Sequence, residues 1–366
     1  MRIATDTSLI GPHSPLVPML VPLVSRGDRD TGQTSWDRRY ENYELAAQSL
    51  FEVVAIGDAD VVVIPIDWYW VRGRSWATRP NRQLAKRCRQ LANLARHHQK
   101  PIVVFFGGDR SCDRVSIPDS IVLREGAFKS RLTSSDVALP AFAEDLVEHF
   151  CNGQIVERAH SSHPVVGFCG LAGERSGLRS WLKLVAGRAV VAARERRIDP
   201  SPYLGETLRS EALQILAQRS DIESNFIVRD SSVFFRDANT LDLVDVRQQY
   251  VENMINCDYV LCLRGSGNYS YRVYEAMCMG RIPILVDTDC ALPFPDQIDW
   301  KGSCVWVEHG DLPNIAQAIL DFHRRLSPEE FSALQHANRQ TWLTWLSPLG
   351  FFEKFESIVH ATKPGI

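Results

Sequence analysis

The sequence predicts an α/β protein in which two parallel-sheet domains follow one another. Short apolar runs alternate with amphipathic segments, which is the pattern of strands joined by crossover helices. The alternation occurs twice, on either side of a polar stretch at 152–163. Because 366 residues leave room for about two domains, we expect one domain over 1–160, a second over 161–343 and a helical segment over 344–366.

Composition and charge exclude several classes of protein. Hydrophobic residues make up 45% of the chain and charged residues 23%, which excludes a disordered or repetitive architecture. The 41 basic and 44 acidic side chains give a net charge of -3, so no bulk positive field would hold a nucleic acid. The nine cysteines form no Cys-x-x-Cys pair and several lie in apolar runs, so we expect reduced thiols and no structural metal site.

The apolar stretch at 8–25 is not expected to cross a membrane. Four prolines remove helical hydrogen bonds along it, and the acidic Asp6 precedes it where a signal peptide carries basic residues. A clean apolar run of about 18 residues, which a membrane span needs, occurs nowhere in the sequence. We therefore expect a soluble, cytoplasmic protein with at most peripheral contact to a membrane.

The predicted elements of the first domain are two buried strands and a helix. "DVVVIPI" at 60–66 is continuous and β-branched, and "PIVVFF" at 101–106 repeats this character. Between them, a helix is predicted at 82–98, basic on one face and with a stripe of leucines on the other: Leu84, Leu91 and Leu94.

The second domain is predicted to begin with a strand at 164–168. Glycines punctuate the loop that follows, and a helix is predicted over 175–186. A strand, a glycine-containing loop and a helix start form a corner that can bind phosphate, although glycines at this spacing serve a tight turn equally well. Two more helices are predicted at 311–326 and 328–343.

The segment 258–300 predicts one complete βαβ unit. Ser270 is the expected N-cap of its helix, and Gly280 stands where a C-cap glycine belongs. The parts of the unit, in order, are a strand at 259–263, a loop at 264–269, a helix at 271–279 and a strand at 282–286.

This unit carries groups that suit a diphosphate. Arg264 directly follows the first strand, at the sheet edge where open α/β sheets bind ligands, and Gly265 frees backbone amides beside it. Arg272 and Glu275 lie three residues apart at the start of the helix, where a guanidinium can bind phosphate and a carboxylate can accept from ribose hydroxyls. An ordinary surface ion pair between the two is the alternative.

The same segment resembles the exostosin-like glycosyltransferases. In that family a strand ends in Cys and is followed by Arg-Gly, Ser-x-Arg-x-x-Glu-Ala, Gly-x-x-Pro, and Leu-Pro-Phe before a Trp. This chain departs from the pattern at Leu263, where proline is usual, and at Arg281, where the residue is usually small or a cysteine. The matching positions occur in the same order: Cys262, Arg264, Gly265, Ser270, Arg272, Glu275, Ala276, Gly280, Pro283, Leu292, Pro293, Phe294 and Trp300.

The resemblance implies the GT-B fold, in which two Rossmann-like domains face a cleft. The carboxyl-terminal domain would hold a nucleoside diphosphate sugar, with uridine diphosphate favoured, and the amino-terminal domain a glycan or glycolipid acceptor. Carried over by position, Arg264 and Arg272 would meet the diphosphate, Glu275 the ribose or sugar hydroxyls, and the loop from Gly265 to Ser270 the phosphate oxygens. The resemblance also implies that no metal is obligatory and that no separate cofactor is needed.

An inverting transfer would further need a general base from the amino-terminal domain. Asp67 and Asp109 each come directly after a predicted buried strand, which makes them the catalytic candidates, although Asp is also common in turns. His13, in a loop between Pro12 and Ser14, is a weaker candidate. The sequence leaves inversion and retention open.

Two other functions remain as alternatives. One is a non-catalytic member of the same fold that binds a sugar nucleotide without turnover. The other is a nicotinamide-dependent oxidoreductase. The oxidoreductase is disfavoured because "RGSGNYS" places Ser270 where the dinucleotide fingerprint has its third glycine, and the expected acid falls at Asp287 or Asp289, after the next strand.

Overall fold

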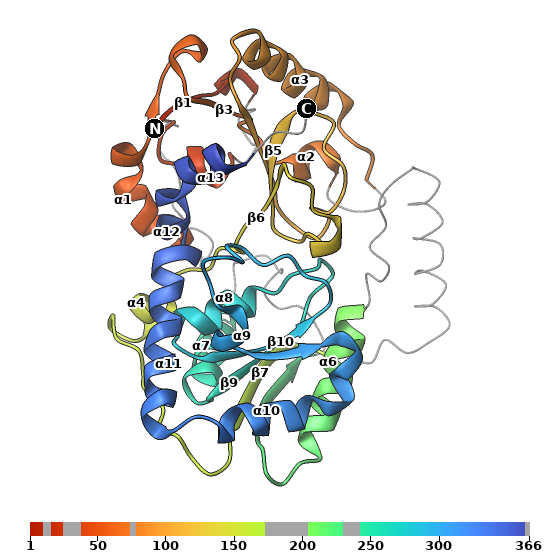
Figure 1. The fold of residues 1–366 in the computed structure, drawn as a ribbon, viewed down its shortest axis with the longest axis vertical. Helices are drawn as coiled ribbons and strands as arrows, with labels where there is room; N and C mark the ends of the chain where they lie inside the picture. The colour runs from red at the N-terminus through yellow and green to blue at the C-terminus, as the bar shows by residue number, and fades with distance from the viewer. Residues whose placement is uncertain (10–15, 25–37, 74–77, 173–203, 230–241, 363–366) are drawn as a thin grey trace.

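The structure, a computed structural model, contains two parallel β-sheets, one in each half of the chain (Figure 1). This arrangement confirms the predicted α/β class and agrees with a two-domain, GT-B-like fold. No helix in the parts of the chain described here is long and apolar enough to cross a membrane. The structure describes the following residues: 1–9, 16–24, 38–73, 78–172, 204–229 and 242–362.

The first sheet has six parallel strands in the order β2-β1-β3-β4-β5-β6. β3 is shorter than the predicted strand at 60–66, because Pro65 has no N–H to donate to the ladder, and Ile66 pairs instead with Leu16 in an isolated bridge. The strands are β1 (Arg2–Ala4), β2 (Glu52–Val53), β3 (Val61–Val63), β4 (Ile102–Phe106), β5 (Ser120–Arg124) and β6 (Asp136–Ala138).

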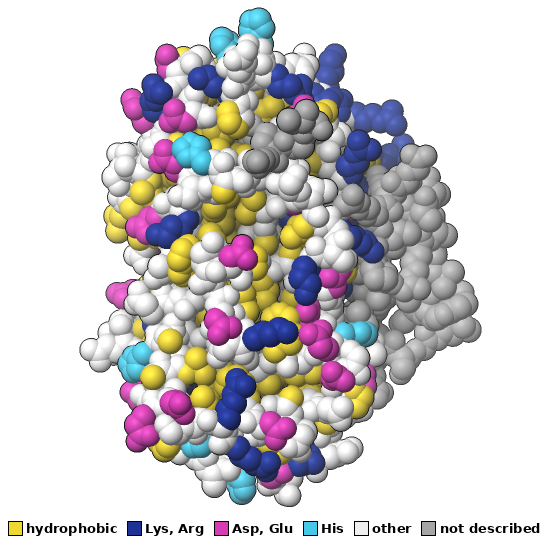
Figure 2. Space-filling model, in the orientation of Figure 1, with side chains coloured by type: hydrophobic (Ala, Val, Ile, Leu, Met, Phe, Trp, Pro, Cys, Tyr) yellow, Lys and Arg dark blue, Asp and Glu magenta, His cyan; other side chains and the backbone are white. Residues whose placement is uncertain are grey.

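Helix α3 (Arg82–His97) covers one face of this sheet. The Asn81 side chain caps it by accepting from the Leu84 amide at 3.0 Å. Of the predicted stripe, Leu91 is buried and Leu84 packs against the same core, but Leu94 is 47% exposed. Lysines and arginines gather over the outer face of α3 in the space-filling view (Figure 2). The residues that pack inward are Ala85, Cys88, Leu91, Ala92 and Ala95. The other α-helices of this half are α1 (Glu41–Leu50) and α2 (Trp68–Arg72), whereas α4 (Leu146–Phe150) packs in the core around α8 (Tyr271–Cys278).

The second sheet has five parallel strands in the order β11-β10-β9-β7-β8. The βαβ unit predicted at 258–300 is confirmed as β9, α8 and β10. Its helix begins after Ser270, as predicted, but the Ser270 side chain makes no capping hydrogen bond. The elements of the sheet and this helix are β7 (Val165–Leu171), β8 (Glu223–Arg229), β9 (Tyr259–Cys262), α8 (Tyr271–Cys278), β10 (Ile282–Asp287) and β11 (Val305–Glu308).

The remaining helices cover the second sheet or follow it. The helix predicted at 311–326 begins as a 3-10 turn over His309–Asn314, which contains Pro313, and becomes α-helical only afterwards. These helices are α6 (Leu204–Ala217), α7 (Asp242–Ile255), α9 (Trp300–Ser303), α10 (Ile315–Arg324), α11 (Pro328–Thr341), α12 (Pro348–Glu353) and α13 (Phe355–Ala361).

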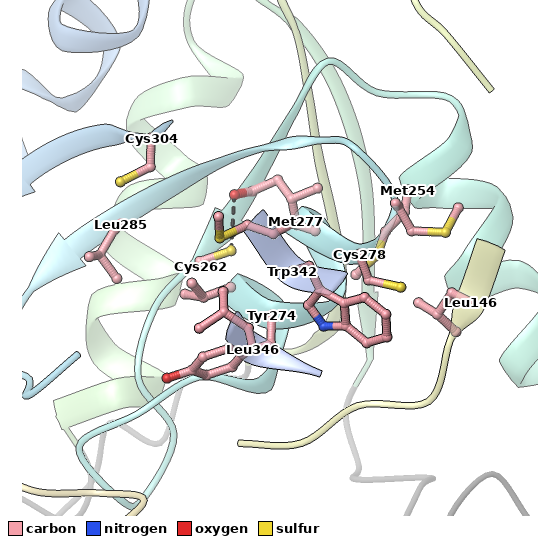
Figure 3. Packing of buried hydrophobic residues seen from close by; sticks show 14 of the residues in the cluster. Leu146, Met254, Cys262, Tyr274, Met277, Cys278, Leu285, Cys304, Trp342 and Leu346 are labelled. Carbon is pink, nitrogen blue, oxygen red and sulfur yellow. Dashed lines mark hydrogen bonds between the residues drawn. The ribbon is translucent and has the colours of Figure 1, made fainter. Parts of the chain in front are cut away.

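The core around α8 is rich in sulfur. Trp342 lies among the side chains of Cys278, Tyr274 and Leu346 in the close view (Figure 3). The Cys262 thiol donates to the Val260 carbonyl rather than to another sulfur. All nine cysteines are free thiols, as the sequence predicts, and each buried one fills space as a small apolar side chain.

The end of the chain returns to the first sheet. α12 and α13 lie beside α1 (Figure 1), and their aromatic side chains enter the core of the amino-terminal half. The ring centroids of Tyr43 and Phe352 are 4.3 Å apart, and Phe352 also contacts Phe105. The segment predicted at 344–366 therefore helps to close the first core, although it follows the second sheet in sequence.

We predict that Phe352→Ala lowers the free energy of unfolding by about 3–5 kcal/mol, because it removes a buried aromatic side chain from a packed core. Urea unfolding followed by tryptophan fluorescence would measure the loss. Leu343→Ala is the matched control, since Leu343 is 38% exposed and lies one residue before the same segment. Equal losses in the two variants would contradict the packing of Phe352 in the core of the amino-terminal half.

Candidate functional site

The segments that follow the carboxyl ends of strands in the two sheets contact each other. Phe128, after β5, forms an antiparallel bridge with Cys290, after β10. Beside it, the Ser130 hydroxyl donates to Asp289 at 2.5 Å. Because carboxyl ends of parallel strands are where α/β sheets bind ligands, this boundary is the candidate site.

Two carboxylates lie side by side on the amino-terminal side of the boundary. The Gly107 amide, at the end of β4, donates to both oxygens of Asp67 at 3.0 and 3.1 Å, and the next amide, of Gly108, donates to Glu125 at 2.7 Å. A Cβ on Gly107 would lie 3.1 Å from Asp67 and 3.3 Å from Glu125. Glycine at position 107 therefore allows both carboxylates to approach the backbone at the end of β4.

Burial makes both carboxylates hold protons more tightly than usual. Burial, partly offset by the amide of Tyr69 and increased by the charge of Glu125, raises the pKa of Asp67 from 3.8 to about 7. Burial also raises the pKa of Glu125, against the lowering effects of the Gly108 amide and Arg39. An acid with a pKa near neutrality can take or give a proton at working pH.

Glu125 was missed in the sequence, because the strand that ends just before it was not identified there. The signal was present: "SIVLRE" at 120–125 is an apolar run followed by an acid, like "DVVVIPID" before Asp67. Asp109, the other predicted base, is exposed and accepts from the Gly267 amide at 3.0 Å across the boundary. His13 lies outside the described residues.

The loop after β9 is held in shape by its own arginine. The Arg264 guanidinium donates to Asn268 at 3.1 Å and to the Ser266 and Gly265 carbonyls at 3.0 and 3.4 Å. Arg264 is 3% exposed, and its guanidinium carbon also lies 5.8 Å from the ring centroid of Phe128 in the other half. Its predicted contact with a diphosphate stays a prediction.

Two other guanidiniums gather at the carboxyl ends of β7 and β9. Arg272 donates to the Cys169 carbonyl at 2.8 Å and lies over the Phe168 ring. Arg209, from α6, donates to the Leu171 and Leu263 carbonyls at 3.2 and 3.3 Å. Burial and the neighbouring Arg272 lower the pKa of Arg209 to about 9. The sequence analysis missed Arg209, which no motif marks.

Both of these guanidiniums have spare hydrogen-bonding capacity. Their Nε atoms are buried and find no hydrogen-bond partner among the described residues. Two crowded cations with unused donors favour an anion between or beside them. Among the same residues, no group of three or more His, Cys, Asp or Glu side chains is placed to hold a metal ion.

Glu275 does not pair with Arg272, so the alternative of a surface ion pair between them is wrong. Its carboxylate accepts from the Tyr250 hydroxyl and, at 3.3 Å, from Arg247. It is the fifth residue of α8, beyond the first turn of the helix, and it is 7% exposed. Arg247 binds Glu144 with its other nitrogens, at 2.8 Å from Nε.

The start of α8 separates the carboxylate pair from the arginines. Tyr271, its first residue, lies under the Arg39 guanidinium at 5.0 Å, and Arg39 lowers the pKa of Glu125. Arg272, the next residue, points to β7 instead. The glycine-loop helix predicted at 175–186 lies outside the described residues, so its phosphate corner is not described here.

We predict that Asp67→Asn becomes more stable relative to the wild type as the pH rises from about 4 to about 7. In this range the folded protein keeps a proton on Asp67 that the unfolded chain releases, so ionisation costs stability in the wild type only. Asn can still accept from the Gly107 amide. Urea unfolding at a series of pH values would measure the difference between the two proteins.

Glu125→Gln provides a second check of the same coupling. Removing the neighbouring charge should lower the pKa of Asp67. In this variant the decrease in the free energy of unfolding should therefore level off at a lower pH than in the wild type. Identical pH profiles for the wild type and both variants would show that the two carboxylates do not share this environment.

Comparisons with known proteins agree with the resemblance found in the sequence. Residues 178–321 match the Exostosin GT47 domain. A probable glucuronosyltransferase of Oryza sativa subsp. japonica, GUT1, is 37% identical over 71 residues, which cover 19% of this chain and 17% of that protein. Exostosin-1 of Drosophila melanogaster is 31% identical over 108 residues, 30% of this chain and 13% of that protein.

A third relative is the probable beta-1,4-xylosyltransferase IRX10L of Arabidopsis thaliana, 38% identical over 64 residues, 18% of this chain and 15% of that protein. The chain therefore spans less than a fifth of the length of each of these relatives. The matches nevertheless agree with the resemblance found in the sequence: residues 178–321 are similar to an exostosin GT47 domain, and several of the relatives are named as glycosyltransferases.

Proposed function

We propose that the protein transfers a sugar from a nucleoside diphosphate sugar, with a uridine diphosphate donor favoured, to a glycan or glycolipid acceptor. The observation that carries this proposal is the placement of cations and acids around the start of α8. Two guanidiniums with unused donors lie on one side, and a protonatable carboxylate pair lies on the other. Such a site offers an anion-binding corner and a base, which glycosyl transfer needs together.

The donor diphosphate is proposed to bind at the arginines. As the bond between the sugar and the diphosphate breaks, negative charge grows on the leaving phosphate oxygen, and Arg272 and Arg209 would stabilise it. The amides from Gly265 to Ser270 and the positive end of α8 would add partial charge. Arg264, with its guanidinium bound inside the loop, would preserve the loop's shape in addition to its predicted role.

Glu275 is proposed to accept from the ribose or from the donor's sugar hydroxyls. Tyr250 and Arg247 bind one oxygen each, but every carboxylate oxygen has a second lone pair. The same two partners fix the carboxylate's orientation. No metal ion is required by this proposal, since the arginines supply the positive charge.

Asp67 and Glu125 are proposed to act as the general base, in a transfer that inverts the anomeric carbon. The acceptor hydroxyl would lose its proton to this pair while its oxygen attacks the anomeric carbon and the diphosphate leaves. A pKa near 7 for Asp67 suits a base that must accept a proton at neutral pH. The cytoplasmic location expected from the sequence stays a prediction.

We expect Arg209→Ala and Arg272→Ala each to lower turnover by a factor on the order of 100, the scale for loss of one preorganised donor. Release of nucleoside diphosphate from donor sugar in the presence of acceptor would measure it. Arg219→Ala is the control, because Arg219 lies just beyond the same helix as Arg209 in an exposed pair with Asp221.

Donor binding is tested separately by thermal shift with a panel of nucleoside diphosphates. A ligand that binds only the folded protein raises its melting temperature by mass action. We expect a shift with uridine diphosphate that is reduced in the two arginine variants. No shift with any member of the panel would refute the donor site, and a shift without any transfer would favour a non-catalytic binding protein.

We expect Asp67→Asn and Glu125→Gln to lower the transfer rate by about 10²- to 10⁴-fold, while the thermal shift with nucleotide stays unchanged. The wild-type rate should rise with pH through about 7, because the base must first lose its proton. Asp109→Asn distinguishes the two candidates for the base, which are Asp109 and the carboxylate pair. If it alone abolishes transfer, the base is Asp109 and the carboxylate pair has another role.

A further inference from the structure

The outer side of α3 forms a positively charged surface that the proposed transfer does not use. Between Asp67 and Asp109 the sequence has nine lysines and arginines and no acid, in a chain whose net charge is -3. Arg82, Lys86 and Arg89 follow one another on α3 at spacings of four and three residues, so they project from one side of the helix. All three are exposed, and Figure 2 shows basic side chains gathered over α3.

This basic face, defined as Arg82, Lys86 and Arg89, belongs to a helix that is fixed in place. The opposite side of α3 is packed on the first sheet through fully buried residues such as Cys88 and Ala92. The helix therefore has no free apolar face to insert into a partner. What it offers is a convex row of charges at the surface of the amino-terminal half.

Among the described residues, no acid forms an ion pair with any of the three cations of the basic face. Arg96, near the far end of α3 and outside this face, lies 3.8 Å from Asp119. Arg89 donates to a neutral group, the Ser116 hydroxyl at 3.3 Å. Leu94, 47% exposed, adds an apolar side chain on the same helix.

We propose that the basic face docks the protein on the anionic headgroups of a lipid membrane. Charge complementarity selects an anionic partner, and a convex row of cations suits a broad plane of headgroups better than a nucleic-acid strand, which would need a groove. Each lysine or arginine near such a surface strengthens binding about fivefold. This inference rests on α3 alone and does not depend on glycosyl transfer.

The test compares binding of the full chain to vesicles of phosphatidylcholine with and without phosphatidylserine. We expect sedimentation with the phosphatidylserine vesicles alone, weakened by salt. The triple variant Arg82→Gln, Lys86→Gln, Arg89→Gln should bind about 100-fold more weakly. Glutamine keeps the helix propensity close to that of the residues replaced.

A matched triple variant changes the net charge equally on the other half of the chain: Lys301→Gln, Arg324→Gln and Arg325→Gln, all exposed. It should bind vesicles like the wild type. Equal binding by both triple variants would overturn the proposal, as would binding to soluble heparin or duplex DNA without binding to vesicles. Transfer to a water-soluble acceptor should be unchanged in the α3 variant, so failure of docking and failure of the proposed function are distinguishable.

Discussion

The arrangement of the site depends on one buried carboxylate, Glu144. It lies in the link, the segment that joins the two sheets between β6 and β7. Glu144 is 1% exposed, and a buried charge is costly unless it is paired and hydrogen-bonded. Arg247 from α7 binds it with two nitrogens and uses the third to bind Glu275 on α8. On its other side, His149 connects Glu144 to Glu41 of α1. The link and α8 are therefore held by one chain of charges.

Fixing α8 in this way decides which groups can meet. The first residue of the helix, Tyr271, contacts Arg39 beside the carboxylate pair, while Arg272 contacts β7 beside Arg209. A small rotation of the helix would separate both sets of contacts. The site is thus a property of the boundary between the sheets, and neither half contains it alone. The ion pairs of Glu144 do not touch the proposed substrates, but they position the residues that would.

Local sequence patterns predict several of the strands and helices and one of the two adjacent carboxylates, Asp67. The β-branched and apolar runs predict β4, β9 and β10 closely, because buried parallel strands are apolar on both faces. They missed short strands such as β1, where only three residues pair. Asp67 was found because an acid directly after a strand is visible in one segment. The pairing of Asp67 with Glu125 was not, because it depends on β3 and β5 flanking β4 in the sheet.

Helix faces were predicted less well for a similar reason. The leucine stripe on α3 fits a helical period, yet the residues that pack on the sheet are three alanines, Cys88 and Leu91, and Leu94 is exposed. Small side chains allow α3 to pack closely on the sheet, and sequence periodicity does not report that distance. Glu275 and Arg272 likewise have the spacing of an ion pair, but each forms its hydrogen bond with a residue from another element.

The two departures from the family pattern lie where they leave the site intact. Leu263 contributes its backbone carbonyl to Arg209 at 3.3 Å, and the usual proline has the same carbonyl to offer. Arg281 precedes β10, at the amino end of the sheet and therefore on the side away from the boundary. There its buried guanidinium binds Gln335 of α11 at 2.9 Å and the Val156 carbonyl of the link. A larger residue at this position thus ties the link and α11 to the sheet, while the carboxyl end of β10 remains available to the site.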